Sequence, residues 1–189
     1  MDDTIEDLCS PWVAALNKTY GTSVKPSDIA EWDMKKAFPG LTSKQIYAPL
    51  MQEEFWDEVK PIPGAPEALF KFIKDGYRVI IVTASHPETV SAKLNKVLFR
   101  YFPFLTYRDV VVASQKDVIS GDVFIDDNPQ NLIYPASSGL RILFSRPHNL
   151  SFNEFGDGIN RYDNWFDIYF AVRSHAITLS LYTYGWFNG

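Results

Sequence analysis

Short apolar runs alternate with helical stretches from about residue 63 onward, and this alternation limits the possible folds more than any other feature. The runs "YRVIIVTAS", "DVVVAS", "DVFIDD" and "LRILFS" are rich in β-branched residues and predict strands. The segments "PETVSAKLNKVLF" and "NPQNLIYPA" predict helices between them, and Pro66 suits the first turn of an earlier helix. Strands that alternate with helices form βαβ units around a parallel sheet. Because the runs are apolar throughout, both faces of the sheet should be covered, and the fold class is α/β.

The N-terminal third predicts helices only. Residues 5–20 place apolar side chains at helical spacing, with Thr4 as the expected cap. Further helical stretches cover about 26–40 and about 42–58. The prolines and glycine of "KPIPGAP" then end this region, so residues 5–62 read as all-helical.

The last residues, 174–189, match neither the strand–helix alternation of the middle of the chain nor the helical pattern of its N-terminal third. In "HAITLSLYTYGWFNG" apolar and polar residues alternate from Ile177 to Leu181, the pattern of a half-exposed strand. A central strand would be apolar on both faces, which this segment is not. A disordered or altered end is the alternative, so the structure of the tail stays open.

Composition and charge exclude several classes of protein. A length of 189 residues suits one domain, or one domain with a small insertion. The net charge of −5 and the lack of a basic stripe argue against binding to duplex nucleic acid. No apolar run approaches the ~18 residues that span a membrane. The lone Cys9 and an acidic first segment, unlike a signal peptide, favour a cytoplasmic protein.

Polar and charged residues stand where the predicted strands end. One strand ends in Thr83, another in Asp126 and Asp127, and Lys116 lies between them in sequence. Ligands of open α/β sheets bind beyond the carboxyl ends of the strands. Clustered carboxylates suit Mg²⁺, while a lysine and a hydroxyl suit a phosphate. Each residue alone also fits a turn or a solvated surface, but the joint order favours a phosphoryl-transfer site.

This order resembles the haloacid dehalogenase (HAD) superfamily of phosphatases. Its second motif is a strand that ends in Thr or Ser, here "VIIVTAS"; its third is a lysine, here Lys116; its fourth is a strand that ends in two acids, here "VFIDDNP". A response-regulator receiver uses similar residues in the reverse order. The resemblance implies a Rossmann-like parallel sheet with a small helical cap inserted after the first motif.

Within the superfamily the chain most resembles the 5'(3')-deoxyribonucleotidases and their bacterial and phage relatives. The marks are the short helical insertion, "PIPGAPEAL", "DDNP" and "NW" near Trp165. The resemblance implies a core domain of residues 1–4 and 63–173, a cap of residues 5–62, and a separate tail of residues 174–189.

The resemblance also assigns roles. Asp2 would be the general acid/base, and Thr83, the backbone at Ala84 and Lys116 would hold the phosphate. Asp2, Asp126 and Asp127 would bind Mg²⁺. Aromatic cap residues would stack on the base, with Trp32 and Phe55 as the candidates. Leu8 stands where relatives can carry an aromatic residue, which leaves the preferred base open.

The first motif of the family is Asp-x-Asp-x-Thr or Val. Thr4 sets the register, so Asp2 is the second acid and the nucleophile would be the residue before Met1. The family's first strand, which lies between the strands ending at Thr83 and at Asp126, would also precede Met1. Either the start is assigned late, or the chain is a truncation. We expect the chain as given to be inactive.

The resemblance thus implies a Mg²⁺-dependent enzyme that removes phosphate from deoxyribonucleoside 5'(3')-monophosphates through an aspartyl-phosphate. The expected partner is a small nucleotide, with no duplex nucleic acid and no membrane, and a homodimer stays open. Two alternatives remain: a HAD phosphatase for another small phosphate ester, and a non-catalytic homologue that binds phosphate and metal.

Overall fold

The computed structural model describes residues 1–133, 139–153 and 158–185, with side chains up to residue 178. Two parallel sheets form the core. One pairs β3 (Ile81–Thr83) with β4 (Val110–Val112), and the other has the order β5 (Val123–Asp126), β6 (Leu140–Phe144) and β7 (Ile159–Tyr162). The predicted parallel α/β core is confirmed. The strand β7 was not predicted, because its residues "INRY" lack an apolar run.

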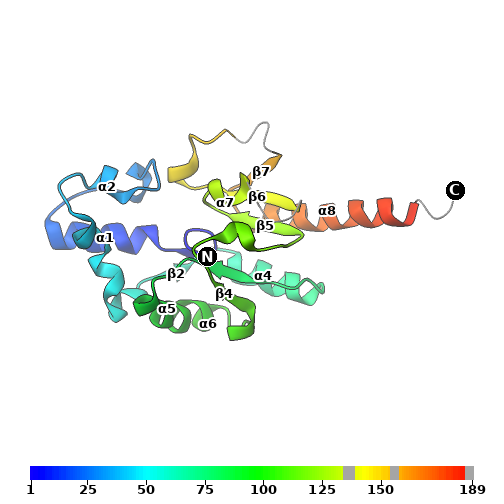
Figure 1. The fold of residues 1–189 in the computed structure, drawn as a ribbon, viewed down its shortest axis with the longest axis horizontal. Helices are drawn as coiled ribbons and strands as arrows, with labels where there is room; N and C mark the ends of the chain where they lie inside the picture. Colours follow the sequence, from blue (N-terminus) through cyan, green and yellow to red (C-terminus); the bar gives the residue numbers. More distant parts are fainter. Residues whose placement is uncertain (134–138, 154–157, 186–189) are drawn as a thin grey trace.

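Helices follow the strands as predicted and cover the sheets (Figure 1). They are α4 (Ala65–Lys74), α5 (Pro87–Lys93), α6 (Phe99–Tyr101), α7 (Gln130–Ile133) and α8 (Trp165–Gly185), with a π-helical turn at Leu94–Leu98 between α5 and α6. In α4, Pro66 lies in the first turn, where a missing N–H costs nothing. Gly76 follows the helix with φ of 89°, a conformation that side chains disfavour.

The N-terminal segment forms a separate group of short helices at one end of the molecule (Figure 1). It contains α1 (Cys9–Tyr20), α2 (Met34–Ala37), α3 (Ser43–Tyr47) and 3₁₀ helices at Pro26–Asp28, Ala48–Met51 and Glu53–Asp57. These elements have their own buried cluster, made of Val13, Leu16, Ile29, Met34, Phe38 and Ile46. This group corresponds to the region that the sequence predicted as helical.

Two details of that prediction were wrong. The first helix begins at Cys9 rather than at residue 5, and Thr4 does not cap it. The segment is also not all-helical, because β1 (Glu6–Asp7) pairs antiparallel with β2 (Lys60–Pro61) where the chain leaves and re-enters the core. The Thr4 hydroxyl instead hydrogen-bonds Asp127, a tertiary contact that the local sequence cannot reveal.

The helix α8 starts against the core and ends away from it. Trp165 is buried, stacks on Phe144 and donates its indole N–H to the carbonyl of Thr4 over 2.9 Å. Farther along, α8 projects beyond the rest of the molecule (Figure 1). The strand-like pattern of residues 177–181 was therefore misleading, since these residues continue the helix. No helix in the described part of the chain is long and apolar enough to cross a membrane.

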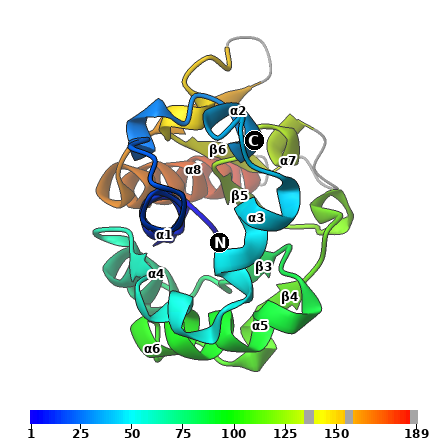
Figure 2. The same ribbon diagram turned by 90° about the vertical axis from the view of Figure 1, so that its left-hand side faces the viewer.

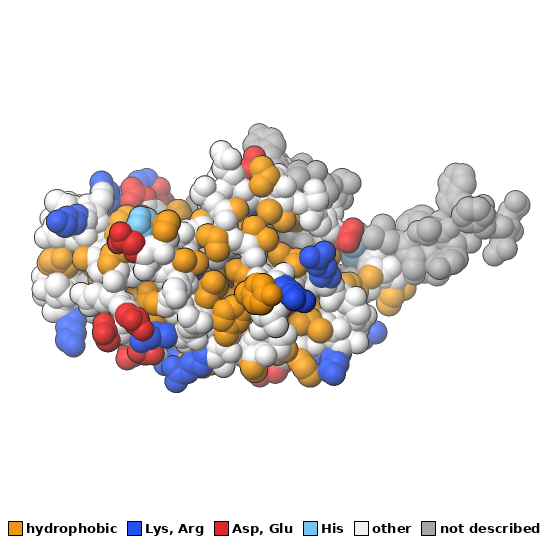
Figure 3. All heavy atoms as spheres, turned by 60° about the horizontal axis from the view of Figure 1, so that its bottom comes forward, with side chains coloured by type: hydrophobic (Ala, Val, Ile, Leu, Met, Phe, Trp, Pro, Cys, Tyr) orange, Lys and Arg blue, Asp and Glu red, His pale blue; other side chains and the backbone are white. Residues whose placement is uncertain are grey.

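The described side chains on one face fall into two groups (Figure 3). Hydrophobic side chains gather in its middle, and the lysines and arginines are spread around them rather than stacked in one stripe. Tyr107 just before β4, Val112 at its end and Val118 after it are among the exposed apolar residues of the molecule.

A cavity of about 540 Å³ separates the two sheets. Residues of β3 and β5 line it, and among the described residues no ladder joins these two strands. Met1 also lines the cavity, and the N-terminus lies between β3 and β5 in Figure 2. The gap occupies the place where the family resemblance puts the first strand.

Candidate active site

The end of β5 carries a fully engaged carboxylate. Lys116 donates to Asp126 Oδ2 over 2.7 Å, while the backbone N–H of Asn128 and the amide of Asn131 donate to Oδ1 over 2.9 and 3.0 Å. Burial alone would raise the pKa of Asp126, but Lys116 and the Met1 ammonium outweigh it and hold the pKa below its usual range. Asp126 is thus an ionised group beside a lysine at the carboxyl end of the sheet.

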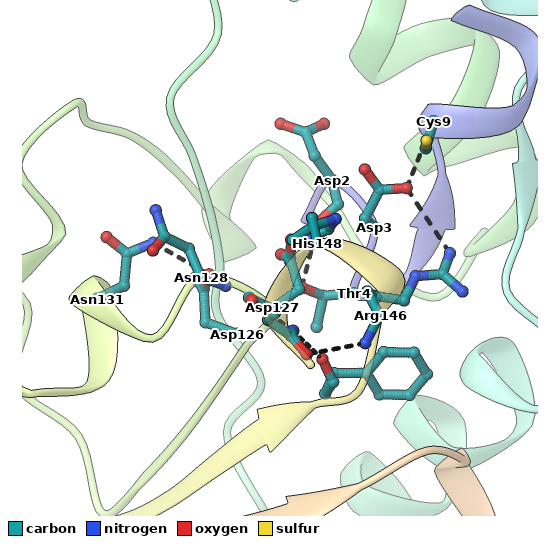
Figure 4. Close-up of polar contacts among 12 residues, drawn as sticks. Asp2, Asp3, Thr4, Cys9, Asp126, Asp127, Asn128, Asn131, Arg146 and His148 are labelled. Carbon is teal, nitrogen blue, oxygen red and sulfur yellow. Dashed lines mark hydrogen bonds and ion pairs between the residues drawn. The ribbon is translucent and has the colours of Figure 1, made fainter. Parts of the chain in front are cut away.

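Its neighbour Asp127 faces the N-terminal segment (Figure 4). Oδ1 accepts a hydrogen bond from the Thr4 hydroxyl over 2.9 Å, and Oδ2 lies 2.8 Å from Nε2 of His148. Asn149 donates to the Asp127 carbonyl over 2.7 Å. The Thr4 hydroxyl also donates to the carbonyl of Asp2 over 3.2 Å, so this one hydroxyl bridges two oxygen atoms. Asp127 therefore links the start of the chain to the end of β5.

The carboxylate of Asp2 points away from Asp126 and Asp127 (Figure 4) and pairs with Lys93. Burial raises the pKa of Asp2, but Lys93 and neighbouring groups reverse this and leave the pKa well below its usual value. Lys93 also donates to the Thr83 hydroxyl over 3.0 Å. Lys93 therefore connects Thr83, at the end of β3, to Asp2, the expected general acid/base.

The sequence reading missed Lys93 and its buried partner Glu6. The Lys93 ammonium lies 3.6 Å from Oε1 of Glu6 and 5.7 Å from the ring centre of Trp56. Neither Glu6 carboxylate oxygen has a hydrogen-bond partner among the described residues, and burial raises the pKa of Glu6 well above its usual value. A signal was present, because Lys93 lies four residues after Thr89 and before Val97, on the buried face of its helix.

Asp3 is buried in a left-handed backbone conformation, with φ of 48°. Its Oδ1 accepts a hydrogen bond from the backbone N–H of Cys9 over 3.1 Å and lies 3.6 Å from Nη2 of Arg146. Burial, followed by the charge of Asp127, raises the pKa of Asp3 to about 7. Asp3 therefore holds the start of α1 against the site.

The predicted base-stacking residues have different positions. Trp32 is 53% exposed and lies edge-on to His148, with ring centres 4.7 Å apart, so it links the N-terminal helices to the Asp127 group. Phe55 is buried and packs in a T-shaped arrangement on Trp56. Trp56, rather than Phe55, contacts Lys93. Ala84, the residue after Thr83, is exposed.

The oxygen atoms near Thr4 suit a hard divalent cation. The carbonyl of Asp2 and Oδ1 of Asp127 both lie within hydrogen-bonding distance of the Thr4 hydroxyl. Asp126, the last residue of β5, directly precedes Asp127. No group of three or more His, Cys, Asp or Glu side chains in the described residues has a metal-binding arrangement. Mg²⁺, however, commonly uses only one or two protein carboxylates and completes its shell with water and phosphate oxygens. The residues therefore fit Mg²⁺.

The comparisons with known proteins agree with this geometry. A family model described as "5' nucleotidase, deoxy (Pyrimidine), cytosolic type C protein" matches residues 1–177. The chain belongs to this family. It is 35% identical over 170 residues to the 5'(3')-deoxyribonucleotidases of Bacillus subtilis (strain 168) and of Bacillus phage SPbeta, covering 89% of this chain and 92% of each relative. It is 32% identical over 155 residues to the 5'(3')-deoxyribonucleotidase of Clostridium acetobutylicum, covering 82% and 84%.

The family and the names of these relatives indicate a hydrolase of the 5'-nucleotidase type. HAD-like phosphatases generally use a divalent metal, which agrees with the cluster of oxygen atoms around Thr4. Of the residues predicted to hold the phosphate, Lys116 contacts Asp126 at the end of β5, whereas Thr83, at the end of β3, contacts Lys93.

Proposed function

We propose that this site removes phosphate from deoxyribonucleoside 5'(3')-monophosphates with Mg²⁺ as cofactor. The observation that carries the proposal is a pair of charged groups at the carboxyl ends of two strands. At the end of β5, Lys116 donates to Asp126; at the end of β3, Lys93 pairs with Asp2 and donates to the Thr83 hydroxyl. The names of the relatives supply the substrate class.

The phosphate would lie between the two strand ends. Lys116 and the Thr83 hydroxyl would bind its oxygens, with the exposed backbone at Ala84 beside them. Lys93 would orient the Asp2 side chain, which is ionised in the free site and would have to take up a proton with the substrate before it acts as the acid. Mg²⁺ would be held by the carbonyl of Asp2 and the carboxylates of Asp126 and Asp127. It would neutralise charge on the phosphate oxygens.

The family resemblance implies two chemical steps. An aspartate attacks phosphorus in line, the ester bond breaks, and the leaving oxygen takes a proton from the carboxyl group of Asp2. Water then hydrolyses the aspartyl-phosphate, with Asp2 taking the proton that the water loses. The family register puts the attacking aspartate directly before Met1, outside the 189 residues of the chain.

The helical segment of residues 5–62 would act as a cap over the nucleoside, separate from a core of residues 1–4 and 63–173. Trp32 would stack on the base, and its half-exposed ring beside His148 and Asp127 supports this role. Phe55 would support the cap from within its core.

A substrate panel tests this function on the chain extended before Met1 by a short apolar strand that ends in Asp. Phosphate release is measured from deoxyribonucleoside monophosphates, sugar phosphates and a chromogenic ester, each with Mg²⁺ and with a chelator. We expect nucleotides to be preferred and the chelator to abolish activity. A preference for sugar phosphates would support the alternative of another small phosphate ester, and no activity on any substrate would support a non-catalytic homologue.

A further inference from the structure

The helix α8 carries a row of exposed apolar side chains, which we call the α8 row. Phe166 is 67% exposed and Phe170 49%, and their ring centres lie 4.7 Å apart. They lie on one face of the helix because they are four residues apart, and Ile177, 56% exposed, falls on the same face seven residues later. A contiguous row of large apolar side chains is a feature of contact surfaces.

The α8 row faces away from the core. The core contacts α8 through Trp165, Ile168 and Val172, which are buried. At 3.6 residues per turn, these three side chains lie roughly 150° around the helix from the α8 row. The row is therefore open to a partner on the side opposite the core.

The second half of α8 lacks a packing surface. Val172 is the last of the described α8 side chains that is buried, and beyond it the helix projects away from the other elements (Figure 1). We call residues 174–185 the arm; its sequence contains no Asp, Glu, Lys or Arg. Helices of this length are marginal in water and gain most of their stability by packing an apolar face. The arm would therefore be stabilised by a second surface.

One helix thus carries both an exposed apolar row beside the core and an apolar arm beyond it. In an antiparallel pair of α8 helices, the arm of each copy would cover Phe166 and Phe170 of the other, so one two-fold axis serves both contacts. Placing Phe170 opposite Ile177 of the other copy puts this axis between residues 173 and 174. Ser174 is small there, and the Arg173 guanidinium is neutralised within its own copy by Asp75, 3.6 Å from its Nε.

The area of such a pair reaches the size of a weak specific interface. Covering the exposed parts of Phe166 and Phe170 would remove about 200 Å² per copy, since an aromatic side chain buries about 150–250 Å² in full. An arm of 12 residues is about 18 Å long and about 11 Å wide, so covering half of its side surface adds about 300 Å² per copy. The total of about 1,000 Å² is at the lower limit for a specific contact.

We propose that the α8 row and the arm form an interaction surface for a second copy of this chain, in which two α8 helices pair antiparallel about a two-fold axis near Ser174. The small area gives a reversible dimer, with a dissociation constant on the order of 10 µM. This surface is independent of the proposed function, because none of its residues belongs to the candidate active site.

The first test is sedimentation equilibrium of the 189-residue chain from about 1 to 300 µM, a range that brackets the expected dissociation constant. We expect a monomer–dimer equilibrium. Phe170→Glu should raise the dissociation constant about 30-fold or more, because a charge would enter an apolar contact. Tyr107→Glu is the matched control: Tyr107 is a 74% exposed aromatic residue far from α8 in sequence, and this variant should associate like the wild type. Circular dichroism and the unfolding midpoint confirm that both variants are folded.

A cross-linking test reads the register directly. With Cys9→Ala as background, Ser174→Cys should form a disulfide-linked dimer under mild oxidation, because the two-fold axis brings this position next to its own copy. Ser151→Cys, at an exposed position outside α8, is the matched control and should stay reduced. Adding Phe170→Glu to Ser174→Cys should prevent the cross-link.

Four results would overturn the α8 pair: a monomer over the whole concentration range, association of Phe170→Glu equal to that of the wild type, equal cross-linking at positions 174 and 151, or loss of association when the chain is extended before Met1 by an apolar strand. The last result would assign the association to the open edges of β3 and β5. A dimer that persists in the extended chain and is lost with Phe170→Glu would support the proposal.

Discussion

Replacing Lys93 with Met should destabilise the protein more than any change to an exposed charge. Lys93 is 2% exposed and its ammonium faces the carboxylates of Asp2 and Glu6. Removing one partner of a buried ion pair leaves uncompensated charge and typically costs about 3–5 kcal/mol. We expect a loss in that range, because Asp2 would keep its charge without its lysine partner.

The assay is urea unfolding of the wild type and variants at pH 7, with the free energy of unfolding taken from the midpoint and slope. Lys96→Met is the matched control, since Lys96 lies three residues on and pairs with Asp57 at the surface over 2.7 Å. Exposed pairs contribute little, so this variant should unfold like the wild type.

A double variant separates charge from packing. Adding Glu6→Gln to Lys93→Met replaces the buried carboxyl group that has lost its lysine partner with a neutral amide, so the double variant should recover part of the lost free energy of unfolding. The reasoning is refuted if Lys93→Met costs less than about 1 kcal/mol, if it equals the Lys96 variant, or if the double variant loses the sum of the two single effects.

Three further predictions concern Trp32, Asp3 and Thr4. In the chain extended before Met1 by an apolar strand that ends in Asp, Trp32→Ala should raise KM for nucleotides more than for a small chromogenic ester, because stacking on a base contributes ~1–3 kcal/mol; equal losses on both would make Trp32 merely structural. Asp3→Asn should be more stable than the wild type above pH 7. The pKa of Asp3 rises from 3.8 to about 7 on folding, which corresponds to about 4 kcal/mol of wild-type stability. This stability is present below pH ~4 and is lost as pH rises through 7. Unfolding curves from pH 4 to 8 would contradict this if the gap between the two proteins did not widen with pH. Thr4→Val should cost about 1–3 kcal/mol in thermal or urea unfolding, because it leaves the buried Asp127 carboxylate short of a donor, and an unchanged midpoint would show that His148 alone satisfies it.

The ends of the strands were predictable because they depend on local pattern. Apolar β-branched runs predicted β3 and β5, and the rule that ligands bind beyond strand ends drew attention to Thr83, Lys116 and Asp126. Lys116 and Asp126 do lie together, 2.7 Å apart, whereas their role in binding phosphate stays a prediction.

The rest depended on contacts between distant residues. Lys93 and Glu6 are 87 positions apart in sequence, and nothing local indicates that two buried charges will meet. Thr4 matched a helix cap, but its hydroxyl bonds Asp127, far along the chain. Alternation after residue 176 suggested a strand, yet the segment continues the helix that Trp165 anchors in the core.

The most direct test of the central claim compares turnover of three purified proteins on a deoxyribonucleoside monophosphate with Mg²⁺. They are the 189-residue chain, the chain extended before Met1 by an apolar strand that ends in Asp, and the same extension ending in Asn. We expect only the Asp extension to be active, with the other two lower by roughly 10⁴–10⁶ in turnover, because residues that act as one catalytic unit fail together. Hydrolysis by the 189-residue chain alone at an ordinary enzymatic rate would contradict the account, as would equal rates for the Asp and Asn extensions.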